Sequence, residues 1–199
     1  MSTDHSAQHG EGNVGDGYSY CSTDQWDEDL WRKAAVIYDS SFPEHGRKPE
    51  QIIRRMFRRK LCRLHLAFDG EETVAMALSG MDRQYEALVI DYLAVAESRR
   101  GTGLGRRFLE SIRQETAERE ICRGIIVEAE AEETPVNLGR IRFWQSCGFK
   151  LTDYVHQYIW VPEPYRALVL SLPEMEPLPE DGRELFGAII RFHEQAYRR

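Results

Sequence analysis

Apolar and polar residues recur along this chain with two different periods, and each period predicts a different kind of element. Between residues 27 and 41 the apolar side chains recur every three or four positions, which predicts a helix. Pro43 ends this helix, because proline disfavours a helical conformation at the residue before it. Pro49 opens a second predicted helix, since proline is tolerated in the first turn. Two amphipathic helices are therefore expected before the first long strands.

Strand patterns follow these helices. Residues 61–68 and 73–79 have the composition of strands, and Asp69-Gly70 between them is a strong hairpin signal. Residues 87–95, ALVIDYLAV, form a nearly continuous apolar run, as expected for a central strand that is covered on both faces. The remaining predicted elements are a helix over 103–120, a strand over 124–128, a helix over 135–146, a strand after Phe149, strand character around 158–161 and 167–170, and a helix over 181–197.

This order of elements predicts an α/β domain with a mixed sheet. We divide the chain into a flexible N-terminal tail over 1–18, one main domain over 19–172, and a C-terminal linker and helix over 173–199. The last helix has an apolar stripe that includes Leu185, Ile189 and Phe192. Two arrangements remain open for it: packing on the main domain, or pairing with a second copy of the chain in a homodimer.

Composition narrows the classes of function. The chain has 199 residues and a formal net charge of -7, which argues against nucleic-acid binding because phosphate contacts need a concentrated basic surface. No apolar stretch reaches the ~20 residues that span a bilayer, and the polar N-terminal segment contains no apolar signal-peptide core. The 4 cysteines include no C-x-x-C pair. We therefore expect reduced thiols in a cytoplasmic protein, without a zinc site or a disulfide framework.

The glycine turn, residues 100–105 (RGTGLG), follows the central strand and opens a helix. The first N–H groups of a helix have no intrahelical partner, and the helix dipole adds positive charge there, so this position suits an anion. A tight turn without a ligand is the other interpretation. The pattern fits neither a Walker loop, which needs Gly-Lys before Ser or Thr, nor the G-x-G-x-x-G dinucleotide fingerprint.

Two motifs together indicate one family. Residues 100–105 match R-x-x-G-x-G in full, and residues 137–149, NLGRIRFWQSCGF, resemble N-x-x-A-x-x-F-Y-x-x-x-G-F. Over residues 24–160 the chain therefore resembles the GNAT superfamily of acyl-CoA-dependent N-acyltransferases. The resemblance implies an α/β fold with a mixed, mostly antiparallel sheet that is splayed between its two central parallel strands, with helices on both faces.

The resemblance also implies a site for acetyl-CoA as cosubstrate, with no metal. The main chain of Leu93, Ala94 and Val95 would hydrogen-bond the pantetheine arm, and the N–H near Val95 would stabilise the developing oxyanion. Asn137 and Trp144 are the further cofactor-binding positions. The pyrophosphate would be held by Arg100, Gly101, Thr102, Gly103, Leu104, Gly105 and Arg106.

The implied chemistry is direct attack of an amine on the thioester. It needs a proton acceptor, because an ammonium group with a pKa of about 10.4 is not a nucleophile at pH 7. Asp91 is the leading candidate, since a charge inside an apolar strand needs a partner or a task. Strict alternation puts its side chain on the same face as Leu93 and Val95. Glu128 ends the neighbouring strand and would face Asp91 across the gap. The alternatives are that Asp91 hydrogen-bonds a nearby loop and that Glu128 is simply solvated.

Trp144 departs from the family pattern, in which many members carry a tyrosine that protonates the leaving thiolate. An indole N–H cannot supply that proton, so either Tyr154 or Tyr158 takes the role, or the thiolate leaves unassisted. We expect an N-acyltransferase that transfers an acetyl group from acetyl-CoA to a primary amine of a small molecule in a ternary complex. A non-catalytic acyl-CoA-binding or regulatory module is the alternative.

Overall fold

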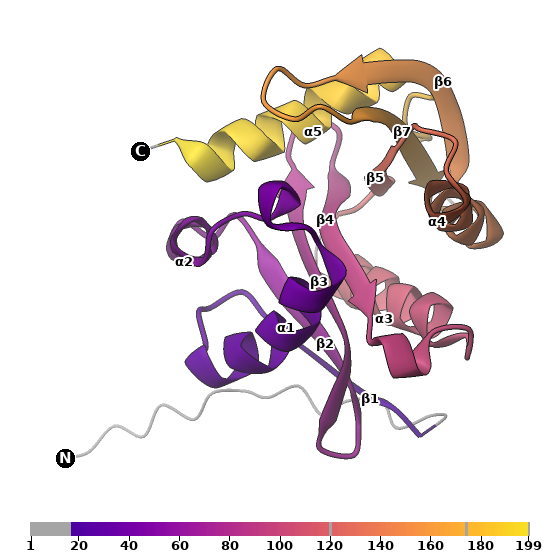
Figure 1. Ribbon diagram of the computed structural model, residues 1–199. Coiled ribbons are helices and arrows are strands. Elements are labelled where there is room, and N and C mark those ends of the chain that lie inside the picture. Colours follow the sequence, from indigo (N-terminus) through magenta and orange to yellow (C-terminus); the bar gives the residue numbers. More distant parts are fainter. Residues whose placement is uncertain (1–16, 120, 174, 199) are drawn as a thin grey trace.

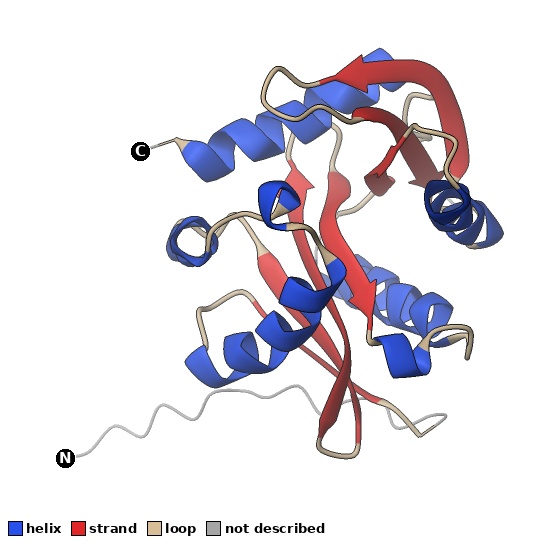
Figure 2. Ribbon diagram, viewed as in Figure 1, coloured by secondary structure: helices blue, strands red, loops and turns tan. Residues whose placement is uncertain are grey.

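The computed structural model of the chain describes residues 17–119, 121–173 and 175–198 (Figures 1 and 2). Most of the tail predicted over 1–18 lies outside these residues. The helices are α1 (Glu28–Ser41), η1 (Glu44–Gly46), α2 (Glu50–Arg58), η2 (Glu97–Arg99), α3 (Leu104–Arg119), α4 (Pro135–Ser146) and α5 (Gly182–Tyr197). The strands are β1 (Ser19–Thr23), β2 (Arg63–Asp69), β3 (Glu72–Asp82), β4 (Ala87–Val95), β5 (Gly124–Glu130), β6 (Lys150–Gln157) and β7 (Pro164–Ser171).

In the described residues, seven strands form one sheet in the order β1-β2-β3-β4-β5-β7-β6. Every neighbouring pair is antiparallel except β4 and β5, which run parallel. Within this part of the chain their ladder joins only residues 87–89 to residues 124–126. Beyond it β4 continues to pair with β3, and β5 with β7. The two central strands therefore diverge toward their carboxyl ends, and the predicted fold class is confirmed.

Helices cover both faces of the sheet and bury two apolar layers (Figure 1). On one face α1, α2 and α5 pack over the strands, and Ile53, Met56 and Phe186 are fully buried there. On the other face α3 and α4 do so, with Phe108 and Ile112 at the centre. The apolar stripe of α5 is therefore covered within this chain. None of the described helices combines the length and the apolar composition needed to cross a lipid bilayer.

Two expectations about strands were wrong. β1 was missed, because its sequence, SYCST, is a short edge strand that stays half-buried throughout and has no apolar pattern. Strand character was expected around residues 158–161, but this segment is a turn between β6 and β7. The side chain of Gln157 donates hydrogen bonds to the carbonyls of Val161 and Pro162, which closes the turn instead of extending the strand.

A β-bulge in β4 corrects the predicted orientation of its side chains. Leu78 of β3 pairs with Tyr92 and the next residue, Ser79, pairs with Ile90, so Asp91 is the extra residue. A bulge reverses the alternation of side chains beyond it. Leu93 and Val95 consequently pack in the layer under α3 and α4, and not on the face of Asp91. The bulge keeps Asp91 on the side of α5.

The contact between α5 and β3 gives a test of the packing. A Cβ atom added to Gly80 would lie 2.3 Å from the carbonyl oxygen of Leu61 and 2.4 Å from Cε2 of Phe192. Gly80→Ala is therefore expected to lower the free energy of unfolding by about 1–3 kcal/mol, as overpacking does. Urea unfolding followed by circular dichroism measures this change.

Gly139→Ala is the matched control, because a Cβ atom at this position in α4 meets no atom within 4 Å. Alanine is favoured over glycine inside a helix by roughly 0.5–1 kcal/mol, so this variant should gain stability. Equal losses in the two variants would contradict the close approach of α5 to β3.

Candidate active site

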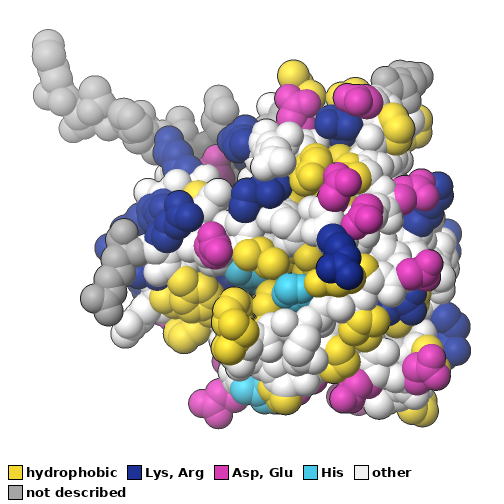
Figure 3. Space-filling view, turned by 90° about the horizontal axis from the view of Figure 1, so that it is seen from above, with side chains coloured by type: hydrophobic (Ala, Val, Ile, Leu, Met, Phe, Trp, Pro, Cys, Tyr) yellow, Lys and Arg dark blue, Asp and Glu magenta, His cyan; other side chains and the backbone are white. Residues whose placement is uncertain are grey.

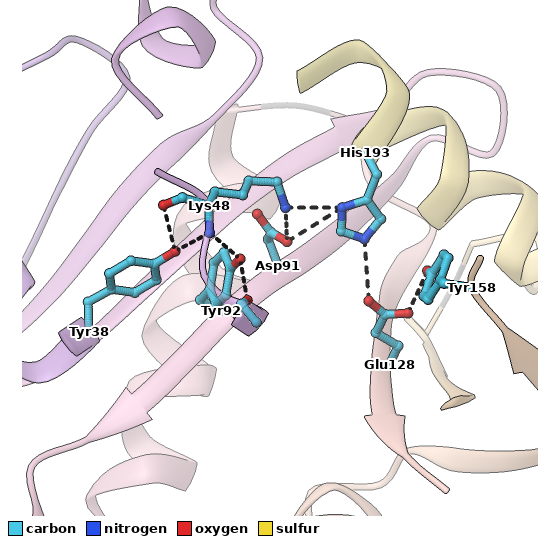
Figure 4. Close-up of polar contacts among 8 residues, drawn as sticks. Tyr38, Lys48, Asp91, Tyr92, Glu128, Tyr158 and His193 are labelled. Carbon is cyan, nitrogen blue, oxygen red and sulfur yellow. Dashed lines mark hydrogen bonds and ion pairs between the residues drawn. The ribbon is translucent and has the colours of Figure 1, made fainter. Parts of the chain in front are cut away.

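Beyond residues 89 and 126 the described strands β4 and β5 are no longer paired, and we call the space between them the opening. A chain of polar contacts crosses it (Figure 4). The Nζ atom of Lys48 lies 2.7 Å from Oδ1 of Asp91 and 3.0 Å from Nδ1 of His193. On the far side, Nε2 of His193 lies 3.3 Å from Oε1 of Glu128. The hydroxyl of Tyr158 donates a hydrogen bond of 2.8 Å to Oε2 of the same carboxylate. Asp91 and Glu128, predicted to face each other, are thus joined through Lys48 and His193.

Five separate parts of the fold deliver these side chains: β4, β5, α5, the segment between η1 and α2, and the turn after β6. The bulge in β4 turns Asp91 toward α5, and regular alternation in β5 puts Glu128 on the same face as Ile126. α5 begins at an N-cap, where the side chain of Asp181 accepts hydrogen bonds from two backbone N–H groups. Phe192 anchors the far end of α5 in the core, and its neighbour His193 thereby reaches the opening.

The backbone of Lys48 is clamped by two tyrosines. Its N–H lies 2.9 Å from the hydroxyl of Tyr38 and 3.0 Å from that of Tyr92. These hydroxyls in turn donate to the carbonyls of Lys48 and Gly46. Burial raises the pKa of both phenols, with the charge of Asp91 adding to the effect, so both keep their protons at neutral pH. The segment between η1 and α2 is therefore held firmly against β4.

Burial divides the polar chain into an inner and an outer part. The side chains of Lys48 and Asp91 are 4% and 2% exposed, whereas those of His193 and Glu128 are 19% and 20% exposed. The second oxygen of Asp91, Oδ2, is buried and has no hydrogen-bond partner in the described residues. Seen from above, histidine side chains lie among hydrophobic ones in the middle of the molecular face, with charged groups around them (Figure 3). A substrate can reach the Glu128 end of the polar chain more readily than the Asp91 end.

Tyr158 fixes how Glu128 is used. Burial raises the pKa of this phenol, and the charge of Glu128 raises it further. The phenol therefore stays protonated and acts as the donor, which leaves the carboxylate of Glu128 as the acceptor.

Among the described residues, no group of three or more His, Cys, Asp or Glu side chains is arranged to hold a metal ion.

The glycine turn lies at the end of β4, beside the same opening. Gly101 and Gly103 have φ angles of 78° and 81°, which favour glycine over any other residue. Cβ atoms added there would meet nothing within 4 Å, so a ligand can approach this main chain. α3 starts at Leu104, and its first N–H groups are the ones that no helical carbonyl can satisfy. The turn is therefore built like an anion site.

Side chains around the turn support its shape. The Nε of Arg100 donates to the carbonyl of Val95 at 3.2 Å, and the guanidinium of Arg107 donates to the carbonyl of Thr102 at 3.1 Å. Arg106 is exposed. Leu93, Ala94 and Val95 occupy the part of β4 that has left β5, as the predicted pantetheine site requires.

The other predicted site residues lie apart from the polar chain. Asn137 is buried, and its amide donates to the carbonyl of Glu132 at 3.2 Å. Trp144 is 9% exposed, with Phe143 and Phe149 packed against its ring. The ring of Tyr154 packs against Phe186, and its hydroxyl lies 3.3 Å from Nδ1 of His156. A catalytic role for Tyr154 stays a prediction that none of these contacts supports.

Sequence reasoning missed Lys48 and His193. His193 stands four residues after Ile189, on the apolar stripe of the last helix, and a titratable residue on such a stripe is the signal that identifies it. Lys48 precedes the proline that opens α2. Its sequence context gives no comparable signal, because its partners come from β4 and α5.

Solved structures share this fold. A protein of Bacteroides thetaiotaomicron assigned to the GNAT acetyltransferases superposes with a TM-score of 0.62 at 20% identity, over 83% of this chain and 89% of that one. Naa50 of Arabidopsis thaliana, in complex with the bisubstrate analogue CoA-Ac-MVNAL, gives 0.60 at 19% identity, over 78% and 99%. The ribosomal-protein-S18-alanine N-acetyltransferase of Escherichia coli gives 0.58 at 16% identity, over 79% and 96%. At these identities the likeness establishes the GNAT fold.

The sequence itself assigns the chain to a family. The profile of the Acetyltransferase (GNAT) family matches residues 24–149, which is more than half of the 199 residues. The chain therefore belongs to the GNAT acetyltransferase family. No curated protein sequence is similar enough to this chain to count as a match.

Proposed function

We propose that this protein is an acetyl-CoA-dependent N-acetyltransferase that acts on the primary amine of a small molecule. The observation that carries the proposal is the opening between β4 and β5, which has the glycine turn at one side and Glu128 at the other. Because β4 and β5 are parallel, their carboxyl ends lie at the same edge of the sheet. One bound thioester could therefore reach both the turn and the carboxylate.

In this proposal the main chain holds most of the acetyl-CoA. The N–H groups of residues 101–106 would bind the pyrophosphate, supported by the charge of Arg106. Leu93, Ala94 and Val95 would hydrogen-bond the pantetheine arm along the open edge of β4. The positive φ angles of Gly101 and Gly103 and the free space above them support this fit.

Glu128 would accept the proton from the attacking ammonium group, directly or through one water. As the amine nitrogen bonds to the acetyl carbon, the C–S bond breaks, and the second proton of this nitrogen passes to the CoA thiolate or to water, so that the products are an amide and CoA. Hydrogen bonds from Tyr158 and His193 support this role, since they hold the carboxylate ready to accept. Asp91 would act through its pairing with Lys48, because its side chain is only 2% exposed.

The alternative, a module that binds acetyl-CoA without catalysis, keeps one observation in its favour. Trp144 is packed in the core between Phe143 and Phe149, and an indole cannot protonate a thiolate. The polar chain around Glu128 supports the enzyme instead, because a binding module needs no proton acceptor beside the thioester.

A panel of amines distinguishes the two functions. Purified protein is mixed with acetyl-CoA and one amine at a time, and release of the CoA thiol is followed. We expect turnover with at least one small primary amine. Tight binding of acetyl-CoA without turnover on any amine, including amines at the N-termini of peptides, would favour the binding module. Turnover with peptides alone would move the substrate class from small molecules to proteins.

Two further proposals concern the cell and the assembly. The cysteines Cys21, Cys62 and Cys147 are free thiols, which supports a reducing, cytoplasmic location. The apolar stripe of α5 is already buried in its own chain, so a homodimer would need a different surface. Light scattering at micromolar concentration measures the mass in solution.

A further inference from the structure

The ammonium group of Lys48 determines which nitrogen of His193 carries a proton. Nζ of Lys48 lies 3.0 Å from Nδ1 of His193 and 2.7 Å from Oδ1 of Asp91. An ammonium has donors and no acceptor. In a hydrogen bond to it, Nδ1 must therefore offer its lone pair, and the ring proton must sit on Nε2.

The other side of the ring favours the same tautomer. Nε2 lies 3.3 Å from Oε1 of Glu128, and a carboxylate only accepts. If the proton were on Nδ1 instead, two donors would face each other at the Lys48 contact, and two acceptors would face each other at the Glu128 contact. This arrangement could not be rescued by Asp91, whose Oδ1 lies 3.9 Å from Nδ1, beyond the range of a hydrogen bond.

We propose that Lys48 is a positioning residue of the active site, which, paired with Asp91, locks His193 in the Nε2–H tautomer so that His193 donates to Glu128. The hydrogen bonds then run in one direction, from Lys48 through His193 to Glu128. Tyr158 donates to the other oxygen of Glu128. With both oxygens fixed by donors, the remaining lone pairs of Glu128 point in a set direction. The effect on rate rests on the proposed acetyl transfer, whereas the tautomer does not.

The tautomer can be read directly in the protein without any substrate. Histidine labelled with 15N at both ring nitrogens gives separate signals for protonated and unprotonated nitrogen in long-range 1H–15N spectra. Comparison with His193→Asn assigns the signals of His193. We expect an unprotonated Nδ1 and a protonated Nε2 in the wild-type protein at neutral pH. A proton on Nδ1, or a doubly protonated ring, would overturn the proposal.

Two variants remove the ammonium. Lys48→Met leaves Asp91 buried without a partner, which can unfold a protein. Lys48→Met combined with Asp91→Leu removes both charges and leaves no unpaired buried charge, so this double variant is the one expected to stay folded. In each variant we expect the ring signals of His193 to move only part of the way toward the average of exchanging tautomers, because the remaining contact with Glu128 still favours a proton on Nε2. In the acetyl-transfer assay kcat should fall about 100-fold, the effect of a slightly misplaced reacting group, with KM for acetyl-CoA unchanged.

Arg191→Met is the matched control. Arg191 also joins α5 to a buried carboxylate, since its guanidinium lies 2.9 Å from Oδ2 of Asp82, whose side chain is 4% exposed. It stands two residues from His193, but its guanidinium contacts Asp82 and the ring of Tyr85, so this variant should keep the wild-type tautomer and kcat. If the ring signals of His193 were also unchanged in the Lys48 variants, Lys48 would not be the residue that fixes its tautomer. A wild-type protein with the expected tautomer and no acetyl transfer would contradict the proposed function, but it would still support the role of Lys48 in fixing the tautomer.

Discussion

Glu128→Gln is expected to lower kcat/KM for acetyl transfer by about 100- to 10,000-fold, the usual contribution of a general base. The amide keeps the size of the side chain but cannot take a proton from an ammonium group. Its oxygen can still accept from either Tyr158 or His193, so the fold around it should hold. The affinity for acetyl-CoA should not change, because the proposed contacts to this ligand come from β4 and the glycine turn.

Glu130→Gln is the matched control for this variant. Glu130 is on the same strand, two residues further on, and lies 3.2 Å from the guanidinium of Arg140 at the surface. Steady-state rates of both variants are measured over a range of amine concentrations. Similar losses in the two variants would assign the effect to the charge of the strand end and not to a base at Glu128.

Gly103→Val is expected to weaken acetyl-CoA binding about 10- to 100-fold, since forcing a side chain into a left-handed conformation costs on the order of 1–3 kcal/mol. The φ angle of Gly103 is 81°, which a β-branched residue avoids strongly. The turn must then move, and its N–H groups no longer converge on the pyrophosphate. Isothermal titration calorimetry with acetyl-CoA measures the loss.

Gly70→Val separates loss of the site from general strain. Gly70 also has a positive φ angle, 60°, with nothing within 4 Å of an added Cβ atom, but it lies in the turn between β2 and β3. This variant should lose stability and bind acetyl-CoA with normal affinity. Normal affinity in Gly103→Val as well would mean that the glycine turn does not hold the ligand.

The local elements of the fold were readable from the sequence, because their signals lie within a few neighbouring residues. The continuous apolar run of β4 and the proline at the start of α4 gave the bounds that the structure has. The two motifs gave the splayed sheet through the family resemblance. β1 carried no such signal, since its five residues are ordered by pairing with β2 and not by their own pattern.

The arrangement of the candidate site was only half readable. Glu128 and Asp91 stood out as charges at an apolar strand, but the bulge that orients Asp91 depends on the register with β3. His193 comes from α5, which lies beyond the residues that the family profile matches. Contacts between segments so far apart in sequence follow from the tertiary fold, and no local period encodes them.

The most direct test of the account follows the acetyl group itself. Acetyl-CoA labelled with 13C in the acetyl carbonyl is incubated with the protein and the best amine of the panel. The products are then identified and quantified by mass spectrometry. The account predicts one labelled amide for each CoA thiol released by the wild-type protein, and a rate at least about 100-fold lower with Glu128→Gln. Thiol release with labelled acetate as the product, or equal amide formation by both proteins, would contradict it.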